Sequence, residues 1–251
     1  MSLLIRNATL GDHTTDLYIA DGRFQCIGSN LDRSAEQTID ARDKAVLPPL
    51  VNGHTHAAMA LLRGYADDMD LHTWLTQHIW PLEGRLEEED VYVGSLLACL
   101  EMIKSGTLFF NDMYWHFAGT ARAVAEMGLR AELSSVFIDF GDPQTAKAKQ
   151  ANCLEQLARY QNANPLLQCA LGPHAVYTVS RESLEWVRET AAQYDLRIHI
   201  HLAETEKEVA DCVAQTGLRP VAYLDALGLL SPRLVACHAV WLEPEEMDLL
   251  A

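Results

Sequence analysis

The feature that most constrains the fold is a repeat of short apolar runs separated by longer amphipathic stretches, beginning at Ala45. Short apolar runs are typical of buried strands, and the longer stretches have the periodicity of helices. Strands are expected over residues 45–51, 107–112, 131–138, 166–171, 197–202 and 234–238. Helices are expected over residues 87–104, 119–127, 145–162, 181–194, 206–216 and 219–227. Strands and helices that alternate in this way build a parallel α/β sheet.

Six such repeats predict a (β/α)8 barrel of the TIM type, with a doubly wound open sheet as the alternative fold. A full barrel needs two more repeats than the sequence supplies, and the last helical pattern runs to Ala251 without a closing glycine, proline or polar tail. We therefore expect residues 48–251 to form a barrel that is truncated after its sixth strand.

Residues 1–47 have a different pattern, with short alternating segments at 3–5, 17–19 and 24–27. Asp21-Gly22 lies between two of these segments and is a strong signal for a β-hairpin. This region is expected to be the N-terminal part of a small β-sandwich domain.

Composition excludes several classes of partner. The 251 residues are 49% hydrophobic, enough to bury one large core. Nineteen basic against 35 acidic side chains give a net charge of −16, which repels nucleic acids and anionic membranes.

The start of the sequence lacks a secretory apolar region, so a cytoplasmic location is expected. Six cysteines without a CxxC pair indicate reduced thiols rather than a disulfide framework.

His54 and His56 stand two positions apart after the first apolar run. Alternate residues of a strand share one face, so both imidazoles can reach a single metal ion. The pair alone is weak evidence for a metal site. The evidence is stronger because the pair lies at the carboxyl end of a barrel strand, where the active sites of these barrels are found.

Two further strand ends carry histidines. His199 and His201 share a face, and His201 lies nearer the rim and is the better ligand, whereas His199 is expected to pack in the interior. Glu204 lies three positions after His201, close enough to exchange a proton with a group bound at a metal. The competing interpretation is an ordinary acidic residue at a helix start, which the helix dipole favours. His238 ends the sixth strand and taken alone would be a satisfied core residue. Three strand ends that deliver histidines to one rim favour a metal site.

Five strings of the sequence form a recognisable set: Pro49-Leu-Val-Asn-Gly-His54-Thr-His56, Trp80-Pro-Leu-Glu83, Gly172-Pro-His174-Ala, His199-Ile-His201-Leu-Ala-Glu204 and Cys237-His238-Ala. Together they resemble the amidohydrolase superfamily, and within it the deaminases of 5′-methylthioadenosine and S-adenosylhomocysteine. The resemblance spans essentially the whole chain.

The resemblance implies a zinc ion bound by His54, His56 and His201, with Fe²⁺ or Mn²⁺ as alternatives because imidazoles accept several ions. A fourth ligand, an aspartate on an eighth strand, is implied but has no counterpart in the sequence. Family members with two metals carry a modified lysine on the fourth strand; residues 166–171 contain no lysine, which favours one ion.

The implied reaction is hydrolytic deamination of the adenine ring of a sulfur-containing nucleoside. Glu204 would protonate the ring nitrogen, and His238 would orient the attacking water and stabilise the developing charge. Glu83 would accept hydrogen bonds from ribose hydroxyls, and His174 would contact the base or sugar. For Glu83, an ordinary acidic residue at a helix start is the competing interpretation.

Other interpretations stay open. The same barrel and ligands serve guanine or cytosine deamination and triazine hydrolysis. The chain is alternatively an inactive fragment that keeps part of a metal site, an interpretation that the missing strands support. The exposed edges of an open six-strand barrel pair or aggregate, so such a fragment would need a complementing chain for stability. The expected partner is a small nucleoside, and exposed apolar helices would suit a homodimer.

Overall fold

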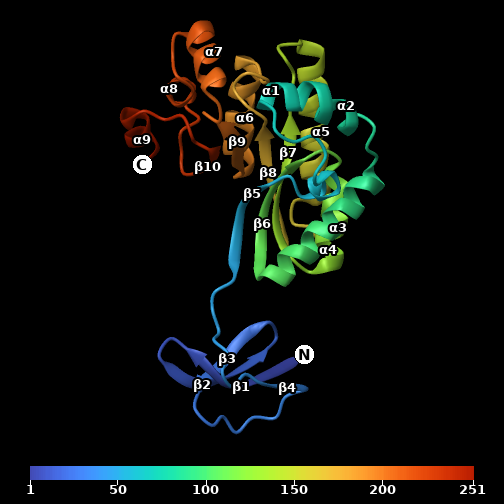
Figure 1. Ribbon diagram of the computed structural model, residues 1–251, viewed down its shortest axis with the longest axis vertical. Helices are drawn as coiled ribbons and strands as arrows, with labels where there is room; N and C mark the ends of the chain where they lie inside the picture. The colour runs from blue at the N-terminus through green and yellow to red at the C-terminus, as the bar shows by residue number, and fades with distance from the viewer. The chain divides into compact units, whose positions relative to one another are not determined.

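The computed structural model describes residues 1–251, which divide into two compact units, Met1–Pro49 and Leu50–Ala251 (Figure 1). The first unit is one four-stranded sheet in the order β3-β2-β1-β4. Its strands are β1 (Ser2–Leu10), β2 (His13–Ala20), β3 (Arg23–Gly28) and β4 (Gln37–Asp40). The structure shows a single sheet here, so the second sheet of a sandwich stays a prediction.

The predicted hairpin at Asp21-Gly22 is confirmed, because β2 and β3 pair antiparallel on either side of these residues. Asp21 and Gly22 have positive φ angles of 53° and 70°. A type I′ turn requires this conformation at both central residues, and its twist matches that of the flanking strands.

The second unit alternates strands and helices. Its strands are β5 (Leu50–Thr55), β6 (Thr107–Tyr114), β7 (Arg130–Phe137), β8 (Leu167–Pro173), β9 (Arg197–Leu202) and β10 (Leu234–His238). Short helical turns follow β5: η1 (Ala57–Leu62), α1 (Leu71–Thr73), η2 (Trp74–Ile79) and α2 (Trp80–Glu83). The longer helices are α3 (Glu88–Ser105), α4 (Phe117–Met127), α5 (Pro143–Tyr160), α6 (Arg181–Tyr194) and α7 (Glu206–Thr216), followed by the shorter α8 (Pro220–Ala226) and α9 (Pro244–Leu250).

The six strands form one parallel sheet in chain order, β5 to β10. A doubly wound sheet would reverse direction within that order, so this alternative is wrong. Although β5 and β10 are opposite edges of the sheet, the ring centroids of His54 and His238 are only 5.1 Å apart. The sheet is therefore rolled into a nearly closed barrel, as predicted, with its carboxyl strand ends gathered at one rim.

The first barrel strand begins later than predicted. Residues 45–51 were expected to form it, but β5 spans Leu50–Thr55, and Ala45 makes only an isolated bridge to Thr9. Pro48 and Pro49 precede the strand and have no N–H to donate to a ladder, so the strand starts after them. As a result His54 lies inside β5 and His56 directly follows it.

The predicted helices agree with α3 to α8 to within two residues at each end. Gly106, Gly128 and Gly217 close three of them with φ angles of 85°, 69° and 76°. This left-handed conformation at a helix C-cap favours glycine because it has no Cβ. None of the helices combines the length and the apolar character needed to cross a bilayer.

Candidate metal centre

Four histidines converge at the rim of the barrel: His54, His56, His201 and His238, here called the histidine cluster. Their rings lie 4.9 Å (His54 and His56), 4.9 Å (His54 and His201), 5.3 Å (His56 and His201) and 5.2 Å (His201 and His238) apart between centroids. One ring nitrogen from each of His54, His201 and His238 lies within 4.8 Å of the other two. His56 lies beside this triplet rather than within it.

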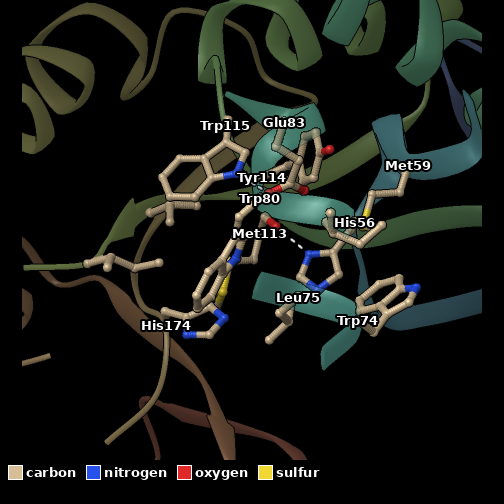
Figure 2. Close-up of a pocket in the computed structure, with 13 residues that line it drawn as sticks. His56, Met59, Trp74, Leu75, Trp80, Glu83, Met113, Tyr114, Trp115 and His174 are labelled. Carbon is tan, nitrogen blue, oxygen red and sulfur yellow. Dashed lines mark hydrogen bonds between the residues drawn. The ribbon is translucent and has the colours of Figure 1, made fainter. Parts of the chain in front are cut away.

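Each of the three histidines that the resemblance implies as ligands uses its Nδ1 for a hydrogen bond. His56 Nδ1 is 2.5 Å from the carbonyl oxygen of Met113, as drawn in Figure 2, and His201 Nδ1 is 2.8 Å from that of His174. A carbonyl only accepts, so both Nδ1 atoms carry hydrogen and both Nε2 atoms keep a free lone pair. Metal-bound histidines in proteins have this arrangement, and the residues therefore fit a metal ion.

Burial favours the neutral form of His54, His56 and His201. Loss of hydration first, and then the neighbouring histidines with His56 foremost, together lower the pKa of His54 to about 3. Burial also lowers the pKa values of His56 and His201. Since only the neutral imidazole binds a metal, the cluster is ready to do so at neutral pH.

A second group of potential ligands lies deeper in the barrel and comprises His54, His199 and Cys237. Burial raises the pKa of the Cys237 thiol to about 12, whereas the thiolate is the form that binds metals. Both ring nitrogens of His199 are already within 2.9 Å of polar neighbours, His54 Nδ1 and Ser134 Oγ. The chemistry of this deeper group is therefore less suited to a metal than that of the histidine cluster.

Glu204 lies beside the histidine cluster, on the loop that follows β9. Its Oε1 is 3.7 Å from His238 Nε2, and burial raises the pKa of its carboxyl group. The loops after β9 and β10 are joined by backbone hydrogen bonds of 2.9 Å from Ala239 N to Leu202 O and from Trp241 N to Ala203 O. These bonds fix the separation between the Glu204 and His238 loops.

The backbone at this rim is unusual. Ala203, His238 and Ala239 have positive φ angles of 49°, 69° and 49°, although none is a glycine. Non-glycine residues in this region cost on the order of 1 kcal/mol or more, and they concentrate at functional sites.

Sequence reasoning missed the role of Glu208. The spacing of Thr205 and Glu208 is typical of a capping box, and Thr205 Oγ1 accepts a hydrogen bond from Glu208 N. The Glu208 carboxylate, however, accepts from Ala203 N and Glu204 N, at 2.9 Å each, and is buried. It thus holds the loop that carries Glu204 rather than completing the helix cap. The Thr205-x-x-Glu208 spacing indicated that the Glu208 side chain contacts the backbone near the helix start, but not that it accepts hydrogen bonds from Ala203 and Glu204.

Sequence reasoning also missed a role for Asp112, near the end of β6. Its side chain is buried, and Oδ1 accepts a hydrogen bond of 2.7 Å from Ala57 N, directly after His56. Burial raises the pKa of this carboxyl group to about 7. An ionisable residue in an otherwise apolar strand was the available signal.

Glu83 and His174 line a common pocket together with His56 (Figure 2). Glu83 Oε2 accepts a hydrogen bond of 2.8 Å from Trp115 Nε1, and burial raises the pKa of Glu83. His174 Nδ1 is 2.9 Å from Thr178 Oγ1, and burial lowers the pKa of His174 to about 4. The rest of the lining is mainly apolar or aromatic: Met59, Trp74, Leu75, Ile79, Trp80, Met113, Tyr114, Trp115, Val136 and Ile138. A pocket of this kind suits a flat aromatic ligand with a few polar groups.

The structure therefore brings all seven predicted site residues to one rim, in two adjoining groups. His54, His201, His238 and Glu204 form one group, and Glu83 and His174 line the pocket. His56 takes part in both. Trp115 holds Glu83, a contact that the sequence pattern did not reveal.

Proteins similar to this chain include a 5′-deoxyadenosine deaminase of Methanoregula boonei, 48% identical over 99% of this chain and 58% of the relative. A 5-methylthioadenosine/S-adenosylhomocysteine deaminase of Archaeoglobus fulgidus is 45% identical over 99% of this chain and 59% of its own length. The chain thus spans about three fifths of the length of these curated relatives.

Among solved structures, an adenosine deaminase from Xanthomonas campestris with bound zinc matches with a TM-score of 0.90. The two are 37% identical, and the match covers 98% of this chain and 60% of the other. Atrazine chlorohydrolase from Arthrobacter aurescens, complexed with zinc, has a TM-score of 0.88 over 99% of this chain and 63% of the other; at 23% identity it shows only a shared fold. The family model described as the amidohydrolase family matches residues 45–251, the whole barrel unit. The chain belongs to the amidohydrolase family.

Proposed function

We propose that this chain carries the metal-binding barrel of an enzyme that hydrolytically removes the amino group from the adenine ring of a 5′-deoxy or sulfur-containing nucleoside and releases ammonia. The observation that carries the proposal is the convergence of His54, His56 and His201, whose ring centroids lie 4.9 to 5.3 Å apart, with Glu204 and His238 beside them and 3.7 Å from each other. The names of the relatives support the substrate class.

The proposed metal is one Zn²⁺ ion held through Nε2 of His54, His56 and His201, with Fe²⁺ or Mn²⁺ as alternatives. The zinc bound in the Xanthomonas structure supports this choice. When bound, such an ion supplies Lewis acidity that brings the pKa of water from 15.7 to about 7. The resemblance also predicts an aspartate ligand on an eighth strand; that strand is not among the six described here and stays a prediction.

Glu204 is the proposed proton carrier. Its raised pKa lets it hold a proton closer to neutral pH than an exposed glutamate does. It would give this proton to the ring nitrogen beside the amino-bearing carbon, take up a proton from the attacking water, and pass that proton to the amino group, which departs as ammonia. A positioned acid of this kind contributes about 10² to 10⁴ in rate.

His238 and the pocket residues have distinct proposed roles. His238 faces Glu204 and would orient the attacking water and stabilise the negative charge that develops at the ring. Glu83, held by Trp115, would accept hydrogen bonds from the ribose hydroxyls. His174, whose Nδ1 is engaged by Thr178, would offer Nε2 to the base or sugar.

Ammonia release and metal content test the function together. Both are to be measured for the 251-residue chain and for any longer form encoded by the same gene, with 5′-deoxyadenosine, methylthioadenosine, adenosine, guanine, cytosine and a chlorotriazine. We expect zinc and ammonia release from the adenine nucleosides. Activity confined to guanine, cytosine or the triazine would assign another amidohydrolase reaction. Bound metal without turnover in every form would identify an inactive remnant.

A further inference from the structure

His199 is a fully buried histidine that the proposed chemistry does not use. It lies on β9 two residues before His201, one layer deeper in the barrel, and has no exposed surface. Its Nε2 is 2.9 Å from His54 Nδ1, and its Nδ1 is 2.9 Å from Ser134 Oγ on β7. Three residues from three strands thus form one continuous line of polar contacts beneath the rim.

The direction of these hydrogen bonds follows once His54 offers Nε2 to a metal ion. His54 Nδ1 then carries the hydrogen and donates it to Nε2 of His199. A neutral imidazole has one donor and one acceptor nitrogen, so His199 Nδ1 must carry hydrogen and donate to Ser134 Oγ.

We propose that Ser134 and His199 form a buried hydrogen-bond relay that fixes the tautomer and ring orientation of His54 for metal binding. The inference rests on the metal centre proposed above and assigns two positioning residues to it. His56 and His201 are held by backbone carbonyls. His54 alone among these three depends on a side chain, so its support can be removed by substitution.

One argument favours this relay over ordinary core packing, and a second favours it over direct metal binding by His199. A buried imidazole without partners costs free energy, so an apolar residue would serve a packed interior better. The relay also excludes His199 as a ligand, because its Nε2 lone pair accepts from His54. The deeper group of His54, His199 and Cys237 is the competing assignment, in which His199 would bind the metal directly.

The test compares the zinc dissociation constants of the parent chain and of five variants by competition with a chromophoric chelator. His199→Leu is expected to raise the dissociation constant about 10- to 100-fold, as loss of a ligand's hydrogen-bond partner does. Ser134→Ala is expected to raise it by a smaller factor. His199→Gln is expected to fall between Leu and the parent, since its side-chain oxygen can still accept from His54.

Two matched controls accompany these variants. Ser135→Ala removes the neighbouring buried hydroxyl, which contacts Cys153 Sγ instead of His199. Cys237→Ala removes the thiol of the deeper group. Both are expected to keep the parental dissociation constant. Thermal unfolding of the metal-free proteins separates a loss of fold from a loss of metal affinity, and the milder Ser134→Ala and His199→Gln variants keep the test decisive should His199→Leu not fold.

Parental zinc affinity in folded Ser134→Ala and His199 variants would overturn the relay while leaving the proposed metal centre intact. Loss of zinc in Cys237→Ala, with a sulfur-to-cobalt charge-transfer band in the Co²⁺ form of the parent, would make His199 a ligand instead. A parent chain that binds no metal ion would overturn the proposed metal centre, and the relay with it.

Discussion

At the scale of single residues, burial shifts the pKa values of two neighbouring groups at the rim in opposite directions. Loss of hydration raises the pKa of Glu204, which favours its protonated form, and lowers the pKa of His238, which favours its neutral form. In such a pair the carboxylic acid is suited to donating a proton, and the neutral imidazole is suited to accepting one. This difference supports the proposed role of Glu204, rather than His238, as the acid of the pair.

Replacement of Glu204 by glutamine tests that assignment. Glu204→Gln keeps the size of the side chain but cannot donate a carboxyl proton, so kcat for ammonia release is expected to fall about 10²- to 10⁴-fold. Zinc content is expected to stay at the parental level, because Glu204 is not a proposed ligand. Glu206→Gln, two residues away and exposed, is the matched control and is expected to keep kcat. Unchanged kcat in Glu204→Gln would remove Glu204 from the mechanism, and loss of zinc would make it a ligand.

Which site residues could be predicted depended on the range of the contacts involved. The period of two along a strand placed His54 and His56 on one face, and the order along the strand placed His201 nearer the rim than His199, because strand geometry is local. The support of these residues is not local. Asp112 reaches Ala57 from another strand, and Ser134 reaches His199 across 65 positions of sequence. Contacts of this kind depend on how the sheet is rolled, which a periodicity does not encode.

At the scale of elements, the order of strands and helices was predictable because each βα repeat carries its own pattern. The exception is the start of β5, where the apolar run from Ala45 was mistaken for the strand itself. Pro48 and Pro49 lie within that run and delay the ladder to Leu50. The short turns η1, α1, η2 and α2 escaped prediction because segments of three to six residues give too little periodicity to identify.

The packing of α3 on η1 gives a prediction at this scale. A Cβ added at Gly94 would lie 2.5 Å from the carbonyl oxygen of Ala58 and 3.0 Å from Leu61 Cγ. Gly94→Ala is therefore expected to destabilise the fold by about 1 to 3 kcal/mol, since overpacking outweighs the better helix propensity of alanine. Urea unfolding measures the loss. Gly53→Ala, whose Cβ meets no atom within 4 Å, is the control. Equal stability of Gly94→Ala and parent would mean that α3 and η1 are less closely packed than described.

At the scale of the whole molecule, the barrel gathers fully and partly buried histidines around one rim. Burial lowers the pKa values of His54 and His199 to about 3 and that of His174 to about 4. In an unfolded chain these groups titrate near 6.5, so below that pH the unfolded state binds more protons than the folded state. The metal-free protein is therefore expected to lose stability as the pH falls from about 6.5 towards 4, by several kcal/mol in all. Asp112, with its pKa raised to about 7, contributes the opposite slope between about pH 4 and 7 and reduces the total.

Substitution of one histidine isolates this effect from the opposing carboxyl group. His174→Asn removes one group that takes up a proton only on unfolding. As the pH falls from 6.5 to 5, the free energy of unfolding of the variant is therefore expected to decrease less steeply than that of the parent. The two slopes are expected to differ by up to about 1.4 kcal/mol per pH unit. Urea unfolding of the chelator-treated proteins at several pH values measures this slope. His13→Asn, in the first unit and exposed, is expected to keep the parental slope. Identical slopes for His174→Asn and the parent would show that His174 is already protonated in the folded barrel, which would conflict with its buried position beside His201.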